Sequence, residues 1–457
     1  MDTKALRQKI LDLAIHGKLV PQDPNDEPAS VLLERIRAEK ERLIKEGKIK
    51  KGKKSAKTSD KPHYPFELPK GWVWCKLDDI AYVASGSTPE KSSFVPKGIP
   101  YIKMYNLRNQ KIDFEYKPQY ITAEIHNGKL QRSRTEVGDL IMNIVGPPLG
   151  KLAIIPPSLP QANFNQAAVL IRPYLHKDNI NVYLKAYLEE MSEINSISTK
   201  GSAGQVNISL TQSQNMRIPL PPLPEIERII KNLKYWLSFV DNIEENKEKL
   251  QDSIRQVKSK VLDLAIHGKL VPQDPNDESA IELLKRINPK AEITCDNPQY
   301  GKLPKGWCLC KISSVVDIVN GKSQKNAESP TGKYPIYGSG GIIGKAMEYT
   351  CLAGSTIIGR KGTINHPIFV EENFWNVDTA FGMKANNQIL EDKYFYCFCL
   401  YFDFSKLDKS SALPSLTKTA IGNLILPIPP LAEQQRIVAK IEELFSQLDK
   451  IESSLQA

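Results

Sequence analysis

Apolar residues recur every three or four positions along a long central stretch of the chain. Only Lys247 interrupts this apolar series, whose members are Ile226, Ile229, Leu233, Trp236, Val240, Ile243, Leu250, Ile254, Val257, Val261 and Leu264. A heptad pattern of this length is typical of a coiled-coil helix. Prolines precede the pattern and Gly268 and Pro272 follow it, so we predict one helix from Glu225 to His267. That helix would be roughly 64 Å long at 1.5 Å per residue.

Three segments of the chain occur twice and in the same order. LDLAIHGKLVPQDPNDE occupies 11–27 and returns unchanged at 262–278, and LPKGW occupies 68–72 and 303–307. The proline-rich segments PLPPLPEIERII and PIPPLAEQQRIV begin at 219 and 427. The offset between copies falls from 251 to 235 to 208 residues, so the second copy is shorter in two places. The chain therefore contains two copies of one unit: a helix, a connector, a variable domain and a second helix.

The heptad register continues at both ends of the chain. The residues in register are Leu6, Ile10 and Leu13 near the start and Ile437, Ile441, Leu444, Leu448, Ile451 and Leu455 near the end. By the repeat offsets, Ala457 corresponds to Lys249 and Met1 corresponds to Asp252, so the repeat closes into a circle opened within one helix. We therefore expect a pseudo-two-fold arrangement, in which the central helix packs antiparallel against a second rod made by the two terminal helices.

The segments between the helices have strand-like runs and one late helical pattern each, which predicts α/β domains. The expected strands are 72–77, 139–145, 151–156, 166–172, 355–359 and 367–371, and the expected helices are 181–193 and 391–407. We expect an α/β (α+β) fold with two globular domains separated by a long antiparallel coiled coil. The predicted order is an N-terminal helix (1–27), a basic connector (28–63), a first variable domain (64–217), a central helix (218–280), a connector (281–298), a second variable domain (299–424) and a C-terminal helix (425–457).

Composition indicates an ordinary soluble globular protein, with 41% apolar and 25% charged residues. No apolar targeting region follows Met1, and no run of eighteen apolar residues occurs, so we expect a cytoplasmic protein without a membrane span. Two Cys-x-Cys pairs, Cys308/Cys310 and Cys397/Cys399, lack histidines at ligand spacing. Reduced thiols are therefore favoured over a structural zinc site.

The net charge of +10 is concentrated in residues 37–61, which hold eleven Lys or Arg against four Asp or Glu. A run rich in lysine, glycine and serine is typical of a solvated linker, and we favour that interpretation. The alternative is a contact with a nucleic-acid backbone, where each cation displaces a condensed counterion.

Three motifs resemble catalytic ones, but each is incomplete. DNPQY at 296–300 lacks the second proline of an amino-methyltransferase loop, and GSGGIIG at 338–344 has the wrong spacing for a phosphate loop, so a glycine-rich turn is favoured. EYK at 115–117 is too short to indicate a nuclease. His16 and His267 end their helices, where a histidine complements the helix dipole. We expect a non-catalytic chain.

In its LPKGW segments, its P-[LI]-P-P-L-x-E segments and its duplicated helices, the chain resembles the DNA specificity subunit of type I restriction–modification systems. The resemblance covers essentially the whole chain. It implies two target recognition domains, each reading one half of a split double-stranded DNA site, and helices that set the gap and dock two methyltransferase subunits. Restriction subunits would join that complex. S-adenosylmethionine, ATP and magnesium would belong to the partner subunits.

Cations should contact phosphates, and Arg, Asn, Gln or Ser should read base edges in the major groove. The DNA-binding candidates in the first domain are Lys103, Asn106, Arg108, Asn109, Lys129, Arg132, Arg134, Lys200 and Gln205. Those in the second are Lys322, Lys325, Ser339, Arg360, Lys361, Lys409 and Lys418. The repeated helix ends place His16, Gly17, His267 and Gly268 at the expected methyltransferase-docking surfaces.

Two functions of other classes are alternatives. A self-sufficient modification enzyme would need a cofactor-binding loop, which the sequence lacks, and would bind S-adenosylmethionine by itself. A coiled-coil scaffold with two protein-binding modules and no DNA role would give no gel shift with the methyltransferase partner present.

Overall fold

The computed structural model describes residues 2–49, 66–146, 149–159, 161–190, 207–294, 296–325, 327–361, 363–407 and 415–456. The chain divides into two compact units, Asp2–Glu245 and Asn246–Ala457. The division falls within one continuous helix, α8, which runs from Leu223 to Ile266 and has 44 residues. This helix confirms the central helix predicted from the heptad pattern, within two residues at its start and one at its end.

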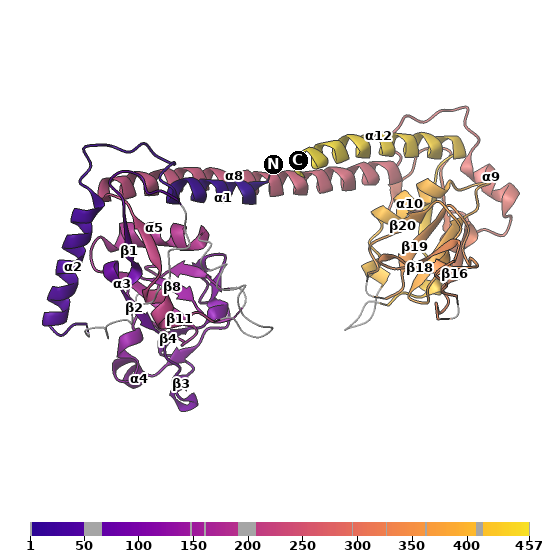
Figure 1. The fold of residues 1–457 in the computed structure, drawn as a ribbon. Coiled ribbons are helices and arrows are strands. Elements are labelled where there is room, and N and C mark those ends of the chain that lie inside the picture. The colour runs from indigo at the N-terminus through magenta and orange to yellow at the C-terminus, as the bar shows by residue number, and fades with distance from the viewer. Residues whose placement is uncertain are drawn as a thin grey trace. The chain divides into compact units, whose positions relative to one another are not determined.

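In each unit a second helix packs against its part of α8 (Figure 1). Helix α1 (Thr3–Ile15) lies beside the first part, where Arg7 pairs with Asp241 at 2.5 Å. Helix α12 (Leu431–Gln456) lies beside the second part, where Lys258 pairs with Asp449 at 2.5 Å. Since Gln22, just beyond α1, bonds to Glu225 at the other end of the pairing, α1 runs antiparallel to α8. Antiparallel helix pairing is therefore confirmed within each unit.

Burial along α8 is less continuous than the heptad pattern predicts. Val240 and Ile254 are buried, but none of the residues between them is, and three predicted seam residues are exposed: Trp236 (42%), Leu250 (39%) and Val257 (47%). The intervening sequence, DNIEENKEKLQDS, consists mainly of charged and polar residues. Such side chains stay hydrated, so regular apolar spacing alone overstates the coiled coil here.

The described residues of the first unit form four small sheets. β1 (Val73–Lys76) pairs antiparallel with β12 (Arg217–Leu220). A four-stranded antiparallel sheet has the order β2 (Ala81–Ser85), β11 (Ala168–Pro173), β8 (Leu140–Asn143), β9 (Leu152–Ile154). A mixed four-stranded sheet has the order β10 (Asn163–Phe164), β4 (Ile99–Ile102), β7 (Tyr120–Ile121), β3 (Phe94–Val95), with β10 parallel to β4. β5 (Leu107–Arg108) and β6 (Lys111–Ile112) form a hairpin. The helices are α2 (Ala29–Lys45), α3 (Leu77–Ile80), α4 (Ala123–Asn127), α5 (Lys177–Glu190) and α7 (Leu210–Gln214).

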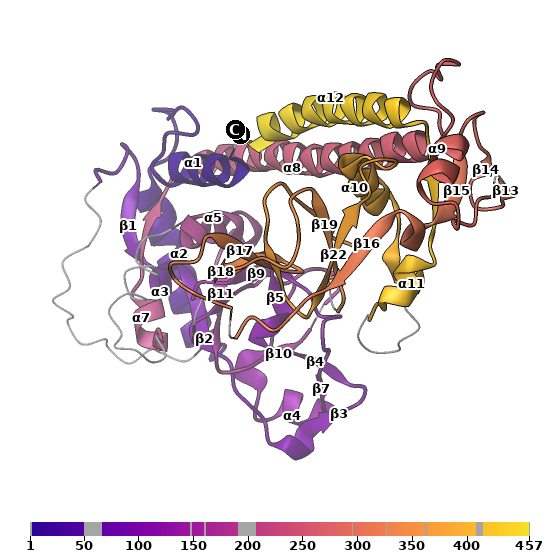
Figure 2. The same cartoon turned by 90° about the vertical axis from the view of Figure 1, so that its right-hand side faces the viewer.

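The second unit repeats this plan with fewer strands. β15 (Cys308–Lys311) pairs with β23 (Ile425–Ile428). The four-stranded sheet has the order β16 (Val316–Asn320), β22 (Ala380–Ala385), β19 (Ser355–Gly359), β20 (Ile368–Val370). The smaller sheet has the order β18 (Gly341–Ala346), β17 (Tyr334–Gly338), β21 (Trp375–Asn376), and β13 (Asp296–Asn297) pairs with β14 (Gly301–Lys302). The helices are α9 (Ala280–Ile287), α10 (Asp392–Tyr401), which packs against α12, and α11 (Lys418–Gly422). Figure 2 shows α12 alongside the second part of α8.

Two sheet-containing domains and a long helix confirm the predicted fold class. The predicted strand 355–359 coincides with β19, and the helix predicted at 391–407 ends earlier, at Tyr401. A separate 3-10 turn, Phe404–Leu407, follows it. Asn365 Oδ1 accepts a hydrogen bond from the Phe404 N–H at 2.7 Å, and Asp403 Oδ1 accepts one from the Ser405 N–H at 3.0 Å. These side chains compete with the helix for backbone donors.

The basic segment 37–61 also differs from the expected linker. Helix α2 continues to Lys45, and its cations are paired with carboxylates: Arg42 with Glu39 and Glu46, and Lys40 with Asp78 at 2.7 Å. The linker interpretation is therefore wrong for residues 37–45. Ion pairs between residues three or four positions apart, such as those of Arg42, stabilise a helix there. Residues 50–65 lie outside the described part of the chain.

Candidate nucleic-acid interface

The repeated segments meet in a buried polar junction that joins the first sheet domain to α8. The Trp72 indole donates to Glu225 Oε2 at 3.0 Å, and the Gln22 amide donates to Glu225 Oε1 at 3.1 Å and to the Gly17 carbonyl at 2.6 Å. Gly17 has φ +64°, and a Cβ there would meet Pro69 at 2.5 Å. Burial raises the pKa of Glu225 above its ordinary value, against the hydrogen bonds from Gln22 and Trp72.

The second unit contains the same junction, bond for bond. Trp307 donates to Glu433 Oε2 at 3.0 Å, and Gln273 donates to Glu433 Oε1 at 3.0 Å and to the Gly268 carbonyl at 2.9 Å. Nearby ion pairs also correspond: Arg228 with Asp26 and Arg436 with Asp277 are both 2.6 Å apart. The duplicated sequence therefore encodes one way of attaching a sheet domain to a helix, used twice.

Replacing either tryptophan should destabilise the unit that contains it. We expect Trp72→Phe and Trp307→Phe each to lower the free energy of unfolding by about 2–4 kcal/mol, since a buried carboxylate loses a donor and the smaller ring leaves a cavity. Urea unfolding followed by circular dichroism measures the loss. Trp236→Phe is the matched control, because Trp236 is exposed, and it should change stability by no more than about 0.5 kcal/mol. Equal effects in all three variants would contradict a structural role for the junction.

His16 and His267 occupy the helix ends as expected. His16 Nδ1 lies 2.8 Å from the Asp12 carbonyl oxygen, and His267 Nδ1 lies 2.7 Å from that of Asp263. A histidine bonded to a last-turn carbonyl complements the helix C-terminus, which confirms the predicted local role. Both rings also pack inside their units, His16 against Phe66 and His267 against Tyr300. Docking of another subunit at these ends stays a prediction.

Four candidates of the first domain lie in or just before the segment 105–117, which includes the β5–β6 hairpin. Arg108 and Asn109 are exposed, and the Arg108 guanidinium carbon lies 4.2 Å from the centre of the Tyr116 ring. Lys103 is half-buried, with Nζ 5.7 Å from the centre of the Phe94 ring. Arg108 and Asn109 are thus placed to contact a ligand.

Asn106 does not fit the contact role expected of it. Its side chain is 1% exposed; its Oδ1 accepts from the Lys103 N–H, and its Nδ2 donates to the Asp113 and Tyr116 carbonyls at 3.1 and 2.8 Å. The Asn106 amide therefore bonds to the backbone of its own segment and is not directed at a ligand. The residue therefore fixes the position of Tyr116, the ring on which Arg108 lies.

The candidates Lys129, Arg132 and Arg134 follow helix α4 in the chain. Lys129 is exposed and pairs with Glu90 at 3.1 Å, while Arg132 is exposed and donates to Ser87 Oγ at 3.0 Å. Arg134 is half-buried, and it donates to the His126 carbonyl at 3.1 Å and to Asn127 at 2.6 Å. Lys129 and Arg132 could exchange these surface partners for phosphates, whereas Arg134 also holds the end of α4.

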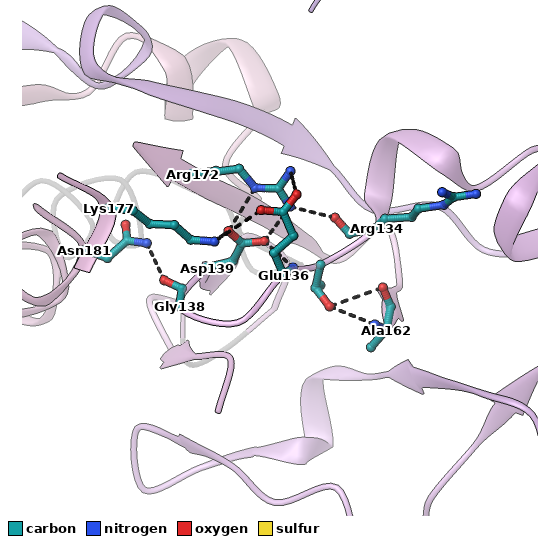
Figure 3. A network of polar contacts seen from close by, with 9 residues as sticks. Arg134, Glu136, Gly138, Asp139, Ala162, Arg172, Lys177 and Asn181 are labelled. Carbon is teal, nitrogen blue, oxygen red and sulfur yellow. Dashed lines mark hydrogen bonds and ion pairs between the residues drawn. The ribbon is translucent and has the colours of Figure 1, made fainter. Parts of the chain in front are cut away.

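An ion network around Asp139 is joined to the backbone of Arg134 (Figure 3). Asp139, whose side chain is fully buried, bonds to Arg172 at 2.6 Å and to Lys177 at 2.8 Å. Arg172 also donates to the Arg134 carbonyl at 3.0 Å. Burial opposes the charge of Arg172, but its bonds to Asp139 outweigh that effect and raise its pKa. The network is structural: it fixes the backbone from which Arg134 projects.

Most of the described candidates of the second domain lie on loops next to β17, β18 and β19, whereas Lys418 begins helix α11. Lys322, Lys325, Arg360, Lys361 and Lys418 are exposed, and Ser339 is half-buried in the turn of the β17–β18 hairpin. The hairpin confirms a glycine-rich turn within GSGGIIG. Lys200, Gln205 and Lys409 lie outside the described residues.

The catalytic look-alikes have structural roles. In DNPQY, the Tyr300 hydroxyl donates to the Ile425 carbonyl at 2.9 Å, and the Asn297 side chain accepts from the Gln299 N–H at 2.8 Å. Cys310 and Cys397 are buried free thiols, and burial raises the pKa of each to about 12. No group of three or more His, Cys, Asp or Glu suited to a metal ion occurs among the described residues. Within the residues that the structure describes, no helix is long and apolar enough to cross a membrane.

Sequence reasoning missed Tyr116 in the first domain and Ile342 and Ile343 in the second. Tyr116 is 38% exposed beneath Arg108, while Ile342 and Ile343 are 62% and 50% exposed on β18. In the sequence, the only indication of the contact between Arg108 and Tyr116 was that an aromatic residue follows an arginine by eight positions, which is a weak signal. The isoleucines would be assigned to a core by composition alone.

Comparison with known proteins gives consistent matches. The sequence profile of the family described as "Type I restriction modification DNA specificity domain" matches residues 69–252 and 304–457. The EcoAI specificity subunit of Escherichia coli is 28% identical, over 98% of this chain and 90% of that protein. The EcoEI specificity subunit of the same species is 27% identical, over 99% and 91%. A chain solved in work on assembly and conformational transition of the type I R-M system has the same fold, with a TM-score of 0.57 and 18% identity over 86% of this chain and 94% of that one.

Proposed function

Because the chain belongs to the family of type I restriction–modification DNA specificity domains, we propose that its two sheet domains are target recognition domains, each of which reads one half of a split DNA site. The chain confers sequence specificity. Its helices set the gap between the half-sites and dock two methyltransferase subunits. In this proposal the chain recognises DNA, and catalysis belongs to its partners.

The duplicated junction is the observation that supports this proposal best. Two bonded Trp–Glu–Gln sets, built on Glu225 and Glu433, attach two domains in the same way to the helices. A dimeric repressor repeats one reader to bind a palindromic site. Here the attachment is repeated while the domains differ, which suits a site with two different halves. Family membership disfavours the alternative of a scaffold without a DNA role.

The exposed cations suit the phosphate part of such an interface. Lys129, Arg132, Lys322, Lys325, Arg360, Lys361 and Lys418 are exposed on loops and element ends. Cations of this kind position a duplex, and each one that neutralises a phosphate releases a counterion. Affinity should therefore fall steeply with salt concentration.

The partners follow from the family. We propose that the complex contains double-stranded DNA, two methyltransferase chains and restriction subunits, and that S-adenosylmethionine, ATP and magnesium bind those partners. The docking surfaces would lie around His16 and Gly17 in one unit and His267 and Gly268 in the other, because both ends have the same sequence and local structure.

The function is tested by expressing this chain with its methyltransferase partner in a host that lacks other adenine methylation. Single-molecule sequencing should then find methylated adenines in one two-part sequence with a fixed unread gap. The same cells without this chain are the control and should show none. Methylation at unrelated sequences, or an unchanged pattern without the chain, would contradict the proposal.

The duplicated helix ends also predict a stoichiometry. The purified complex should contain two methyltransferase chains for each specificity chain, because two equivalent surfaces bind two copies. Native mass spectrometry counts the chains directly. A saturated complex whose mass fits a single methyltransferase would show that the two ends are not equivalent.

A further inference from the structure

The two recognition domains share a strand that lies at the same place in their sheets and in their sequence order. In the first, the Ser87 N–H donates to the Phe164 carbonyl at 3.1 Å, and β4 runs parallel to β10. In the second, the Lys322 N–H donates to the Asn376 carbonyl at 2.8 Å, and β17 runs parallel to β21. In both, this strand follows the first strand of the four-stranded sheet and precedes its second. β4 and β17 are therefore equivalent strands.

The domains diverge directly after these equivalent strands. β4 leads into the segment 105–117 with the β5–β6 hairpin, and β17 turns through Ser339 into β18. The two segments occupy the same place in the repeat and carry opposite chemistry: a stacked arginine in the first and exposed isoleucines in the second. A position that varies on a repeated framework is where a difference in specificity can be encoded.

The first hairpin is held in a strained conformation. Asn109 (φ +48°), Gln110 (φ +55°) and Lys117 (φ +53°) are three of the four described non-glycine residues with positive φ. The left-handed region is unfavourable for residues other than glycine, and such strain persists where the surroundings enforce it, often at functional sites. Here the Gln110 side chain accepts from the Leu152 N–H at 2.7 Å. The turn is thereby pinned, and Arg108 is presented beside it.

Arg108 is pre-organised for a planar partner. Its guanidinium lies on the Tyr116 ring, with Nε 3.5 Å from Asp113 Oδ2, and its side chain remains 49% exposed. A stacked guanidinium keeps its N–H edge free for two parallel hydrogen bonds. Arginine bonded in this way to guanine O6 and N7 is the commonest specific contact in the major groove.

The second hairpin exposes aliphatic side chains beside cations. Ile342 and Ile343 are 62% and 50% exposed. Ile343 lies over Gly338, whose Cβ would be 3.8 Å from it, and Ser339 lies against Gly359, the residue before Arg360. Lys345, in the same strand, is exposed as well, and Glu328 is the acidic neighbour, next to Gly344. The patch is thus apolar at its centre, with cations along its edge.

We propose that these equivalent hairpins are the base-reading elements of the two domains and that they read different base chemistry. Arg108 bonds to a guanine edge in the first half-site, and Ile342 and Ile343 contact thymine C5-methyl groups in the second. This inference rests on the proposed function and adds the chemical class of each half-site. Thymine methyl groups are the apolar feature of the major groove, and aliphatic side chains discriminate them.

The cations favour DNA over a protein as the occupant of the second hairpin. The centre of a protein–protein interface is depleted in charged residues, whereas Arg360 follows directly on the glycine that Ser339 touches. Cations beside an apolar contact suit a duplex, since phosphates flank every base edge.

The test uses the assembled complex with its methyltransferase partner and duplexes containing its methylated site. Replacing the thymines of the second half-site by deoxyuridine removes only their methyl groups. We expect about a fourfold loss of affinity for each contacted methyl, from about 0.8 kcal/mol per buried methyl group. The same replacement in the first half-site is the control and should have a smaller effect. Unchanged binding with deoxyuridine throughout the second half-site would overturn the proposal for that hairpin.

Variants separate the two hairpins. Ile342→Ala with Ile343→Ala should abolish the deoxyuridine effect, whereas Arg108→Lys should relax preference at one guanine by about 10- to 100-fold without altering the second half-site. If the isoleucine variant loses methyltransferase assembly and keeps its thymine-methyl preference, the patch is a protein contact and the inference is wrong. A complex that methylates its site normally while both hairpin variants behave as wild type would refute the inference alone. A complex without any sequence preference would instead refute the proposed function.

Discussion

A chain in which residues 64–217 are replaced by the corresponding domain of a relative is expected to methylate a site with one new half and one unchanged half. Methylation at the old site should be lost completely and replaced by methylation at the new one. Each wrong base pair costs about 1–3 kcal/mol, and a half-site contains several base pairs. Sequencing of methylated adenines before and after the exchange measures this directly.

The structure shows why such an exchange should fold. The strand that closes the domain, β12, pairs with β1 through backbone hydrogen bonds, from Val73 with Leu220 to Lys76 with Arg217, and these tolerate different side chains. The domain reaches α8 through Trp72, which donates to Glu225. A donor domain that keeps the LPKGW segment therefore keeps the attachment.

The matched exchange replaces residues 299–424 and should alter only the other half. Trp307 and Glu433 form the corresponding attachment, so the two exchanges differ in the domain moved and not in how it is joined. The division of labour between the domains would be wrong if either exchange altered both halves or changed the gap. A chimaera that unfolds is distinguished by its circular dichroism spectrum.

Sequence alone foretold the repeated framework well because repetition and periodicity are properties of the sequence. The identity of 11–27 with 262–278 pointed to two equal units, and Gln22 and Gln273 in these segments make the same hydrogen bond to Glu225 and Glu433. The heptad pattern located α8, but exposed residues such as Leu250 and Val257 show that spacing does not fix which apolar residues find a partner.

The candidate interface was harder to foresee because exposure and hydrogen bonding depend on tertiary contacts. Asn106 and Asn109 are similar in sequence terms, yet the first is buried with its amide bonded and the second stands exposed in a turn. Ile342 belongs to a residue type that is mostly buried, and only the hairpin geometry reveals it at the surface. The residue type alone identifies cations that can contact phosphates. The side chains that read bases can be identified only once the fold shows which of them are exposed.

The last prediction concerns helix α8, which we propose sets the distance between the half-sites. Inserting four residues after Lys247 should lengthen the unread gap by one or two base pairs and leave both half-sites unchanged. Four residues add about 6 Å of helix, which corresponds to about two base pairs at 3.4 Å each. The added helical rotation and bending of the DNA make one base pair an equally consistent outcome.

Lys247 is the place for this insertion because little packing depends on it. None of the residues between Val240 and Ile254 is buried, so an added turn should not disturb either hydrophobic core. The ion pairs on either side, Arg7 with Asp241 and Lys258 with Asp449, each lie within a single unit and are kept. A four-residue insertion acts as a stutter, which locally unwinds a coiled coil without breaking it.

The control inserts the same four residues after Asn288, which ends α9 and lies in the connector before the second domain. It lengthens the chain equally without lengthening α8, so its gap should equal that of the wild type. The measurement is again the methylated sequence. If the Lys247 insertion leaves the gap unchanged in an active complex, or if both insertions lengthen it equally, α8 does not set the distance between the half-sites.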